Sequence, residues 1–135
     1  MINELRLSVL LRGEKFSPKE AEKVTGLNLQ DKLEVGAIAP RGRFRGKPVP
    51  YGSAQLEVPD NIPYGERLLW IIEVLGKHLS SFYSMGAETT RIYAGYFYKD
   101  QCNFGFGKDE LQALAKLNID FDISCYDITE DEEIH

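Results

Sequence analysis

A chain of 135 residues is long enough to bury a hydrophobic core and has the size of one domain. Its hydrophobic share of 43% and charged share of 27% are ordinary for a globular protein. The formal net charge of −5 argues against a general nucleic-acid binder, because contacts to phosphates need Lys and Arg. We expect a single domain over residues 1–128, followed by an acidic C-terminal tail over residues 129–135.

The N-terminal region predicts a strand followed by a short helix. In residues 5–11, apolar side chains alternate with mostly polar ones, which is the pattern of a strand with one buried face. Ser17 can cap the helix that follows, and Pro18 suits its first turn. Gly26 can adopt the left-handed conformation that ends such a helix.

The next segment predicts two strands that flank a long loop. Residues 33–39 alternate in polarity and predict a strand, and residues 54–58 predict the strand that returns. The loop between them is rich in Gly, Pro and Arg, which disfavours regular structure. We interpret it as a hairpin loop or a mobile flap.

Residues 62–85 predict the central helix around which the chain is organised. Their apolar residues recur at steps of three and four, the period of a helix with one buried stripe. Asp60 or Asn61 can cap its start, and Gly86 can end it. The stripe consists of Leu68, Leu69, Ile72, Leu75, Leu79 and Phe82.

The C-terminal third predicts a strand over residues 89–99, a short returning strand over 102–106, a helix from 108 or 109, and a strand over 119–128. The complete order is strand, helix, strand, strand, helix, strand, strand, helix, strand. This order predicts an α+β fold with one mixed, largely antiparallel sheet. About three helices should pack mainly on one face of that sheet.

The two cysteines, Cys102 and Cys125, are too few for a disulfide framework and lack the spacing of metal ligands. Free cysteines and the absence of a signal peptide from the start of the chain predict a cytoplasmic protein. A bond between the two cysteines is the alternative, if their strands pair. The central helix is too charged for a membrane span, so we expect no membrane association.

The clearest local charge feature is a basic loop. Its cationic residues alternate with Gly and Phe, and Arg binds phosphate or carboxylate through paired hydrogen bonds. The loop is therefore a candidate site for an anion or an acidic partner, and a solvated hairpin tip is the alternative. The candidate residues are Arg41, Arg43, Arg45 and Lys47.

A second candidate surface is acidic and lies near the C-terminus. It could contact a basic protein, and the alternative is a solvated strand face. The carboxylates lack the spacing of a calcium-binding loop, so we expect no metal site. The candidate residues are Asp120, Asp122, Glu130, Asp131 and Glu132.

No stretch of the sequence carries a catalytic signature. His78 and His135 have no neighbouring Ser, Cys or Asp that suggests a triad, although triads assemble in space. The glycines near residue 105 lack the spacing of a phosphate-binding loop. We therefore expect no catalytic residues, no cofactor and no enzymatic activity.

The order of these features resembles the small bacterial family called domain of unknown function 4279. The resemblance rests on FSPKEAEKVTG at residues 16–26, the helix with Trp70 and EVLGKHL at 73–79, and DELQALAKLNIDFDISCYD at 109–127. The family has no established activity, so the resemblance implies no catalytic residues. Small acidic bacterial domains of this kind are often suspected of being immunity proteins against toxins.

Together these features predict a non-catalytic protein-binding module. The most specific version of this hypothesis is an immunity protein that neutralises a toxin. The first alternative is a domain that binds a small ligand or an anion through the basic loop at residues 41–47. The second alternative is a structural protein that forms a homodimer through a sheet edge.

Overall fold

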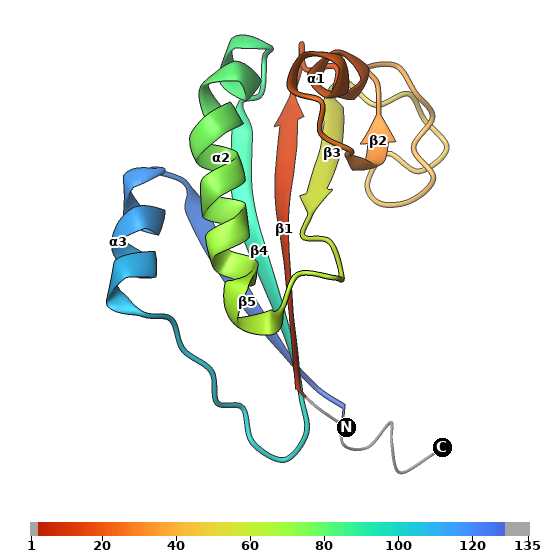
Figure 1. Cartoon of the computed structure of the whole chain (residues 1–135). Coiled ribbons are helices and arrows are strands. Elements are labelled where there is room, and N and C mark those ends of the chain that lie inside the picture. The colour runs from red at the N-terminus through yellow and green to blue at the C-terminus, as the bar shows by residue number, and fades with distance from the viewer. Residues whose placement is uncertain (1–2, 129–135) are drawn as a thin grey trace.

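The computed structural model describes residues 3–128. Five strands form one mixed sheet in the order β2-β3-β1-β4-β5, and three α-helices pack against it (Figure 1). This arrangement confirms the predicted α+β class. The elements are β1 (Glu4–Gly13), α1 (Pro18–Thr25), β2 (Gln30–Leu33), β3 (Gly52–Glu57), a 3-10 turn (Tyr64–Glu66), α2 (Arg67–Ser84), β4 (Thr89–Tyr98), α3 (Lys108–Lys116) and β5 (Asp120–Asp127).

Strand β1 lies at the centre of the sheet and pairs antiparallel with both β3 and β4. Strand β5 then pairs parallel with β4 and forms one edge. The alternation predicted for β1 is observed, because Leu7, Val9 and Leu11 are buried under the helices while Arg6 on the other face is exposed. The register of the sheet is therefore fixed by its apolar face.

Helix α2 covers the buried face but begins at Arg67, five residues later than expected. The preceding residues form a 3-10 turn after Pro63. Arg67 anchors this junction, because its guanidinium donates hydrogen bonds to the carbonyl oxygens of Leu5 at 2.8 Å and Ile62 at 3.0 Å. The predicted stripe is buried at Leu68, Ile72, Leu75, Leu79 and Phe82, whereas Leu69 is 43% exposed.

Helix α1 has the ends that the sequence predicts. The Oγ of Ser17 accepts a hydrogen bond from the backbone N–H of Glu20 at 3.2 Å, and Pro18 occupies the first turn. Gly26 adopts a left-handed conformation with φ of 76°. Ser17, Pro18 and Gly26 are local signals for the two ends of this helix.

The strand predicted over residues 33–39 is wrong. Strand β2 ends at Leu33, and the carboxylate of Glu34 turns toward α1, where it accepts hydrogen bonds from the Oγ of Ser17 and the N–H of Lys19. Gly36 then adopts φ of 88°, which is incompatible with an extended strand.

The short strand predicted over residues 102–106 is also wrong, so the chain has one strand fewer than expected. Both edges of β4 are already paired, with β1 and β5, and no edge remains for a returning strand. The segment instead packs its rings onto the core: Phe104 lies 4.3 Å from Tyr96, and Phe106 lies 5.9 Å from Phe121, between ring centroids.

Within residues 3–128, no helix combines the length and the apolar character needed to cross a membrane. The predicted acidic tail at residues 129–135 lies outside the described residues.

Candidate functional site

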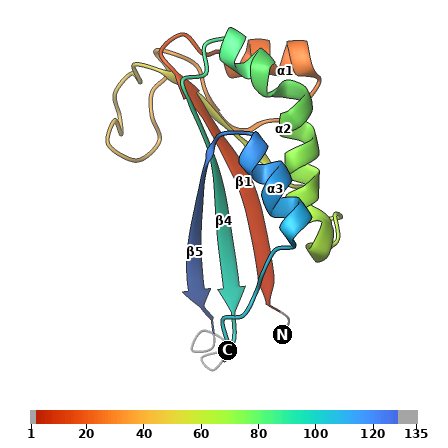
Figure 2. The same ribbon diagram turned by 90° about the vertical axis from the view of Figure 1, so that its left-hand side faces the viewer.

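The helices leave one face of the sheet uncovered. Figure 2 shows α1, α2 and α3 on one side of the strands and the long loop before β3 on the other. The uncovered face carries the strand side chains that the helices do not bury, which include both polar and aromatic residues. In its middle row, Leu10 of β1 lies opposite Gln55 of β3 and Arg91 of β4. This face is the surface on which a ligand could meet the sheet without displacing a helix.

A groove with a volume of about 620 Å³ lies where the long loop meets this face. Its floor comes from β1 and β3, and its walls come from β2 and the loop. The side chains that line it and bear on the argument are Arg12, Asp31, Lys32, Arg41, Arg43, Phe44, Tyr51, Ser53 and Gln55.

The loop over the groove has a defined hairpin-like path. Backbone hydrogen bonds join Gly36 N–H to Val49 O at 2.9 Å, Ala39 N–H to Lys47 O at 3.0 Å, and Gly46 N–H to Ala39 O at 2.9 Å. Ala39 and Val49 are buried, which adds an apolar anchor at the base of the loop. Of the two interpretations offered by the sequence, the hairpin is the one observed.

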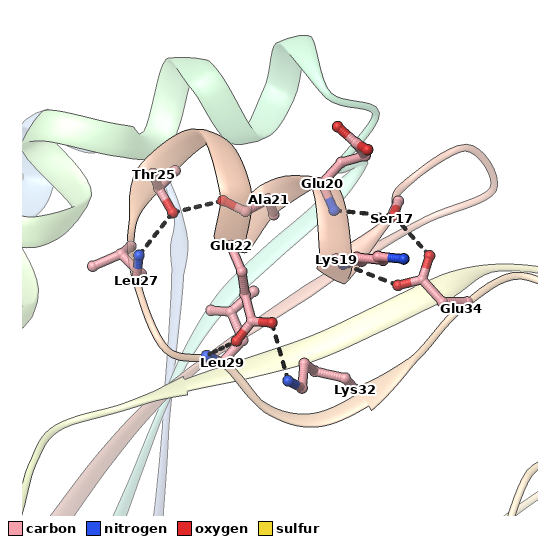
Figure 3. Close-up of polar contacts among 10 residues, drawn as sticks. All are labelled: Ser17, Lys19, Glu20, Ala21, Glu22, Thr25, Leu27, Leu29, Lys32 and Glu34. Atoms are coloured by element: carbon pink, nitrogen blue, oxygen red, sulfur yellow. Dashed lines mark hydrogen bonds and ion pairs between the residues drawn. The ribbon is translucent and has the colours of Figure 1, made fainter.

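Helix α1 holds the outer wall of the groove in place (Figure 3). Glu34 binds the N-terminus of the helix, with 2.6 Å to the Oγ of Ser17 and 2.9 Å to the N–H of Lys19. Glu22 accepts a hydrogen bond from the N–H of Leu29 at 2.9 Å and one from Nζ of Lys32 at 3.0 Å. Together these two carboxylates fix the path of residues 29–34.

The hydrogen bonds to Glu22 also shift its titration. The bond from the Leu29 N–H, and then the contact with Lys32, lower the pKa of Glu22 below its ordinary value of 4.5, because both favour the charged carboxylate. The wall of the groove therefore depends on an ionised Glu22 at neutral pH.

Two arginines and two aromatic rings form a continuous stack along the groove. The guanidinium carbon of Arg12 lies 4.3 Å from the ring centroid of Tyr51. Tyr51 in turn meets Phe44 edge to face, with 5.9 Å between centroids. The guanidinium of Arg43 lies 5.4 Å from the ring centroid of Phe44. Stacking restrains the guanidinium planes without consuming their hydrogen-bond donors.

Arg12 is the most notable member of this stack. Its Nε is buried and has no hydrogen-bond partner, and no carboxylate of residues 3–128 lies within ion-pairing distance of it. A half-buried cation of this kind normally pairs with a carboxylate, since desolvation without compensation is costly. Arg12 lines the groove, and within residues 3–128 its terminal guanidinium nitrogens make no hydrogen bond or ion pair, so these donors are available to a ligand there.

The groove is locally basic in an acidic protein. Four cationic side chains line it against one carboxylate, while the whole chain carries a net charge of −5. Asp31 pairs only loosely with Arg41, at 3.7 Å, and both side chains are exposed. Lys32 is already engaged by Glu22. Arg12 and Arg43 are therefore the cations most available to a ligand.

The predicted basic residues divide into two groups. Arg41 and Arg43 line the groove, as does Phe44 between them. Arg45 and Lys47 are exposed and lie outside the lining of the groove. Their backbone groups instead hold the hairpin, since the N–H of Arg45 bonds Gly42 O and the carbonyl of Lys47 accepts from Ala39.

The predicted acidic residues are neutralised in part by a neighbour. Arg91 of β4 donates to Asp120 at 2.9 Å and to Asp122 at 3.2 Å, and these contacts raise the pKa of the Arg91 guanidinium. The side chains of Arg91, Asp120 and Asp122 lie on the uncovered face. Asp120 is directly opposite Arg91, which in turn is opposite Leu10 of β1. Glu130, Asp131 and Glu132 lie outside the described residues.

The described part of the chain offers no grouping of three or more His, Cys, Asp or Glu that could hold a metal ion. His78 is half-buried on α2, with its ring centroid 6.4 Å from that of Phe82. The groove itself contains no nucleophile paired with a base. The lining groups that can contact a ligand include the guanidinium groups of Arg12 and Arg43 and the rings of Phe44 and Tyr51.

Sequence reasoning missed Arg12 and Tyr51, the two residues at the base of the groove. Arg12 stands where the strand pattern ends, and Tyr51 follows a proline in the loop. The alternation of β1 does place Arg12 on the same face as Ser8 and Leu10, which is the signal that could have found it. That no carboxylate within residues 3–128 pairs with Arg12 is visible only in three dimensions.

The chain was compared with family models, curated proteins and solved structures, and none of them matches it.

Proposed function

We propose that this protein is a binding domain that takes a small anionic ligand in the groove on the uncovered sheet face. The observation that supports the proposal is the half-buried Arg12, which stacks on Tyr51 and has no acidic partner among the described residues. A ligand carboxylate or phosphate would supply the missing negative charge and accept the free N–H groups. The basic loop and the sheet then act as two sides of one site.

The dimensions and chemistry of the groove fit this ligand class. Small-molecule sites have volumes of about 300–1,000 Å³ and combine apolar walls with a few polar groups, and this groove has 620 Å³. Arg43 and Arg41 can approach the anion from the loop, while Ser53 and Gln55 offer neutral hydrogen-bonding groups from β3. We propose binding without turnover, because the lining contains no base or nucleophile in a catalytic pair.

The direct test is a thermal-shift screen followed by calorimetry. The probes are inorganic phosphate, pyrophosphate, citrate, benzoate and nucleoside monophosphates, all at matched ionic strength. Binding to the folded state raises the melting temperature in proportion to the logarithm of ligand concentration. We expect at least one probe to give a saturable shift that the Arg12→Gln variant loses. A shift of equal size in that variant, or no shift with any probe, contradicts the proposal.

A second candidate function is protein binding, supported by a separate aromatic patch on the uncovered face. Phe97 and Tyr126 stack with 4.9 Å between ring centroids, and Tyr93 and Tyr126 are 40% and 49% exposed. A second groove of about 470 Å³ runs beside them, and its charged lining residues are Glu57, Asp60 and Arg6. Exposed aromatic side chains beside carboxylates suit a basic protein partner.

The most specific partner for this second candidate function is a toxin with a basic surface. Retention of one stoichiometric partner on immobilised protein, lost in Tyr93→Ala and Tyr126→Ala but kept in Arg12→Gln, would favour it over the ligand-binding proposal. A doubled mass in light scattering that the same tyrosine variants reduce would favour the homodimer instead.

A further inference from the structure

Cys102 and Cys125 are separated by more than twenty residues in the sequence, yet their side chains meet. Both thiols are free, and desolvation first, followed by the neighbouring thiol of Cys125, raises the pKa of the Cys102 thiol, so the two side chains are neighbours. Cys102 lies in the segment after β4, and Cys125 lies on the edge strand β5. Both residues are exposed to solvent, so that small reagents can reach them.

The sheet and the aromatic core create this proximity. The parallel register of β4 and β5 places Cys125 directly beside Tyr96. The hydroxyl of Tyr96 donates a hydrogen bond to the carbonyl oxygen of Asn103 at 2.8 Å, and its ring packs against Phe104 at 4.3 Å. These contacts fold residues 102–104 back over Tyr96 and bring Cys102 to the neighbouring strand.

A second tether supports the same conformation from the N-terminal side. The amide of Asn3 donates to the hydroxyl of Tyr96 at 3.1 Å, and its carbonyl accepts the N–H of Lys99 at 3.0 Å. Tyr98 lies close enough to both cysteines for their thiolate charges to raise the pKa of its phenol, after the larger effect of desolvation. These contacts hold the segment that carries Cys102 against the end of β4, next to the strand that carries Cys125.

We propose that Cys102 and Cys125 form a redox-active thiol pair, which a small disulfide of the glutathione class oxidises to an intramolecular disulfide. The thiolate of Cys125 attacks one sulfur of the small disulfide, which forms a mixed disulfide and releases one small thiolate. The thiolate of Cys102 then attacks the sulfur of Cys125 and releases the second small thiolate. The protein loses two electrons and two protons, and the small disulfide is reduced to two thiols.

The bond would lock a region away from the groove. It would close a ring that contains all of α3 and would tie the segment between β4 and α3 to the edge strand. Such a ring constrains the unfolded chain, so the oxidised protein should melt at a higher temperature than the reduced protein. The inference is independent of ligand binding at Arg12, because neither cysteine lines the groove.

The test uses the full chain, incubated with oxidised glutathione and analysed by intact mass spectrometry without reductant. We expect a monomer lighter by two hydrogen atoms, a peptide cross-link between Cys102 and Cys125, and a melting temperature raised by several degrees that dithiothreitol reverses. The variants Cys102→Ser and Cys125→Ser should stop at the mixed disulfide with one glutathione. They also control for any change in folding.

Four results would overturn the inference. Two stable glutathione adducts on one chain would mean that the thiols cannot reach each other. A covalent dimer would mean that they pair between molecules. Unmodified protein after prolonged incubation would mean that neither thiolate is reactive. An intramolecular disulfide with an unchanged or lower melting temperature would contradict the proposed locking of the region around α3.

Discussion

The guanidinium of Arg12 lies over the ring of Tyr51, with 4.3 Å between the guanidinium carbon and the ring centroid. This contact joins the last part of β1 to the end of the long loop, and it holds a cation at the base of the groove. Since Tyr51 restrains Arg12 without accepting its hydrogen bonds, the cation remains available to a ligand. The contact between Arg12 and Tyr51 therefore helps to explain how a protein with a net charge of −5 has a locally basic groove.

Arg12→Gln should abolish most of the anion binding. Loss of a charge-assisted hydrogen-bond pair costs about 2 kcal/mol, or roughly thirtyfold in Kd. Calorimetry with the best probe of the anion panel measures this change. Arg6→Gln is the matched control, because Arg6 lies on the same strand and face but outside the groove. An equal loss in both variants would point to a general charge effect.

Tyr51→Ala and Tyr51→Phe should separate stacking from hydrogen bonding. The phenylalanine ring preserves the contact under Arg12, so Tyr51→Phe should bind the probe within about twofold of the original protein. Tyr51→Ala releases the guanidinium and should weaken binding by about tenfold, since a cation–π contact of about 1 kcal/mol is lost together with its restraint. Weak binding by both variants would show that the hydroxyl, not the ring, carries the effect.

Glu34→Ala should destabilise the fold near α1. It leaves the Oγ of Ser17 and the N–H of Lys19 without their shared acceptor, which we expect to cost about 1–2 kcal/mol of unfolding free energy. Denaturation in urea measures the difference. Glu20→Ala is the control, because Glu20 is exposed and contacts Ser17 only through its backbone N–H. A larger loss in the control would refute this assignment.

Glu22 should make stability depend on pH in the acidic range. Its folded pKa is lowered, chiefly by the N–H of Leu29, so the unfolded state binds its proton more readily. The stabilisation is therefore present above the ordinary value of 4.5 and is lost as the pH falls through the lowered folded pKa. Glu22→Gln should melt earlier than the original protein at pH 7, and the difference should shrink below about pH 4. A difference that stays constant across this range would argue against ionisation as the cause.

Gly13→Ala and Gly76→Ala should have opposite effects on stability. A Cβ at Gly13 would lie 1.9 Å from the carbonyl oxygen of Gly86, so the backbone at the end of β1 must shift, at a cost of about 3 kcal/mol. A Cβ at Gly76 meets no atom within 4 Å on helix α2, and alanine there should add about 1 kcal/mol. Thermal unfolding compares the two variants. Similar melting temperatures would show that the close approach of β1 to Gly86 is not constrained.

The elements that the sequence determined are those whose causes are local. The alternation of β1, the Ser17 and Gly26 ends of α1 and the helical period of α2 depend on neighbours a few residues apart, and these are observed, except that Leu69 is exposed where the stripe predicted it to be buried and Ile71 is buried instead. The α+β class follows from that order of elements. The basic loop was also evident from the sequence, because its cationic residues lie close together in the chain.

Tertiary structure decided the features that depend on distant partners. The segment at residues 102–106 has strand-like alternation, yet both edges of β4 are occupied and its rings pack on the core instead. Only the fold shows that Arg12 has no carboxylate partner within residues 3–128, that Arg91 pairs with Asp120, and that Cys102 and Cys125 are neighbours. Pairing and burial depend on residues that are far apart in the chain. A sequence pattern predicts which side chains share one face of a strand or helix, but not which distant residues contact that face.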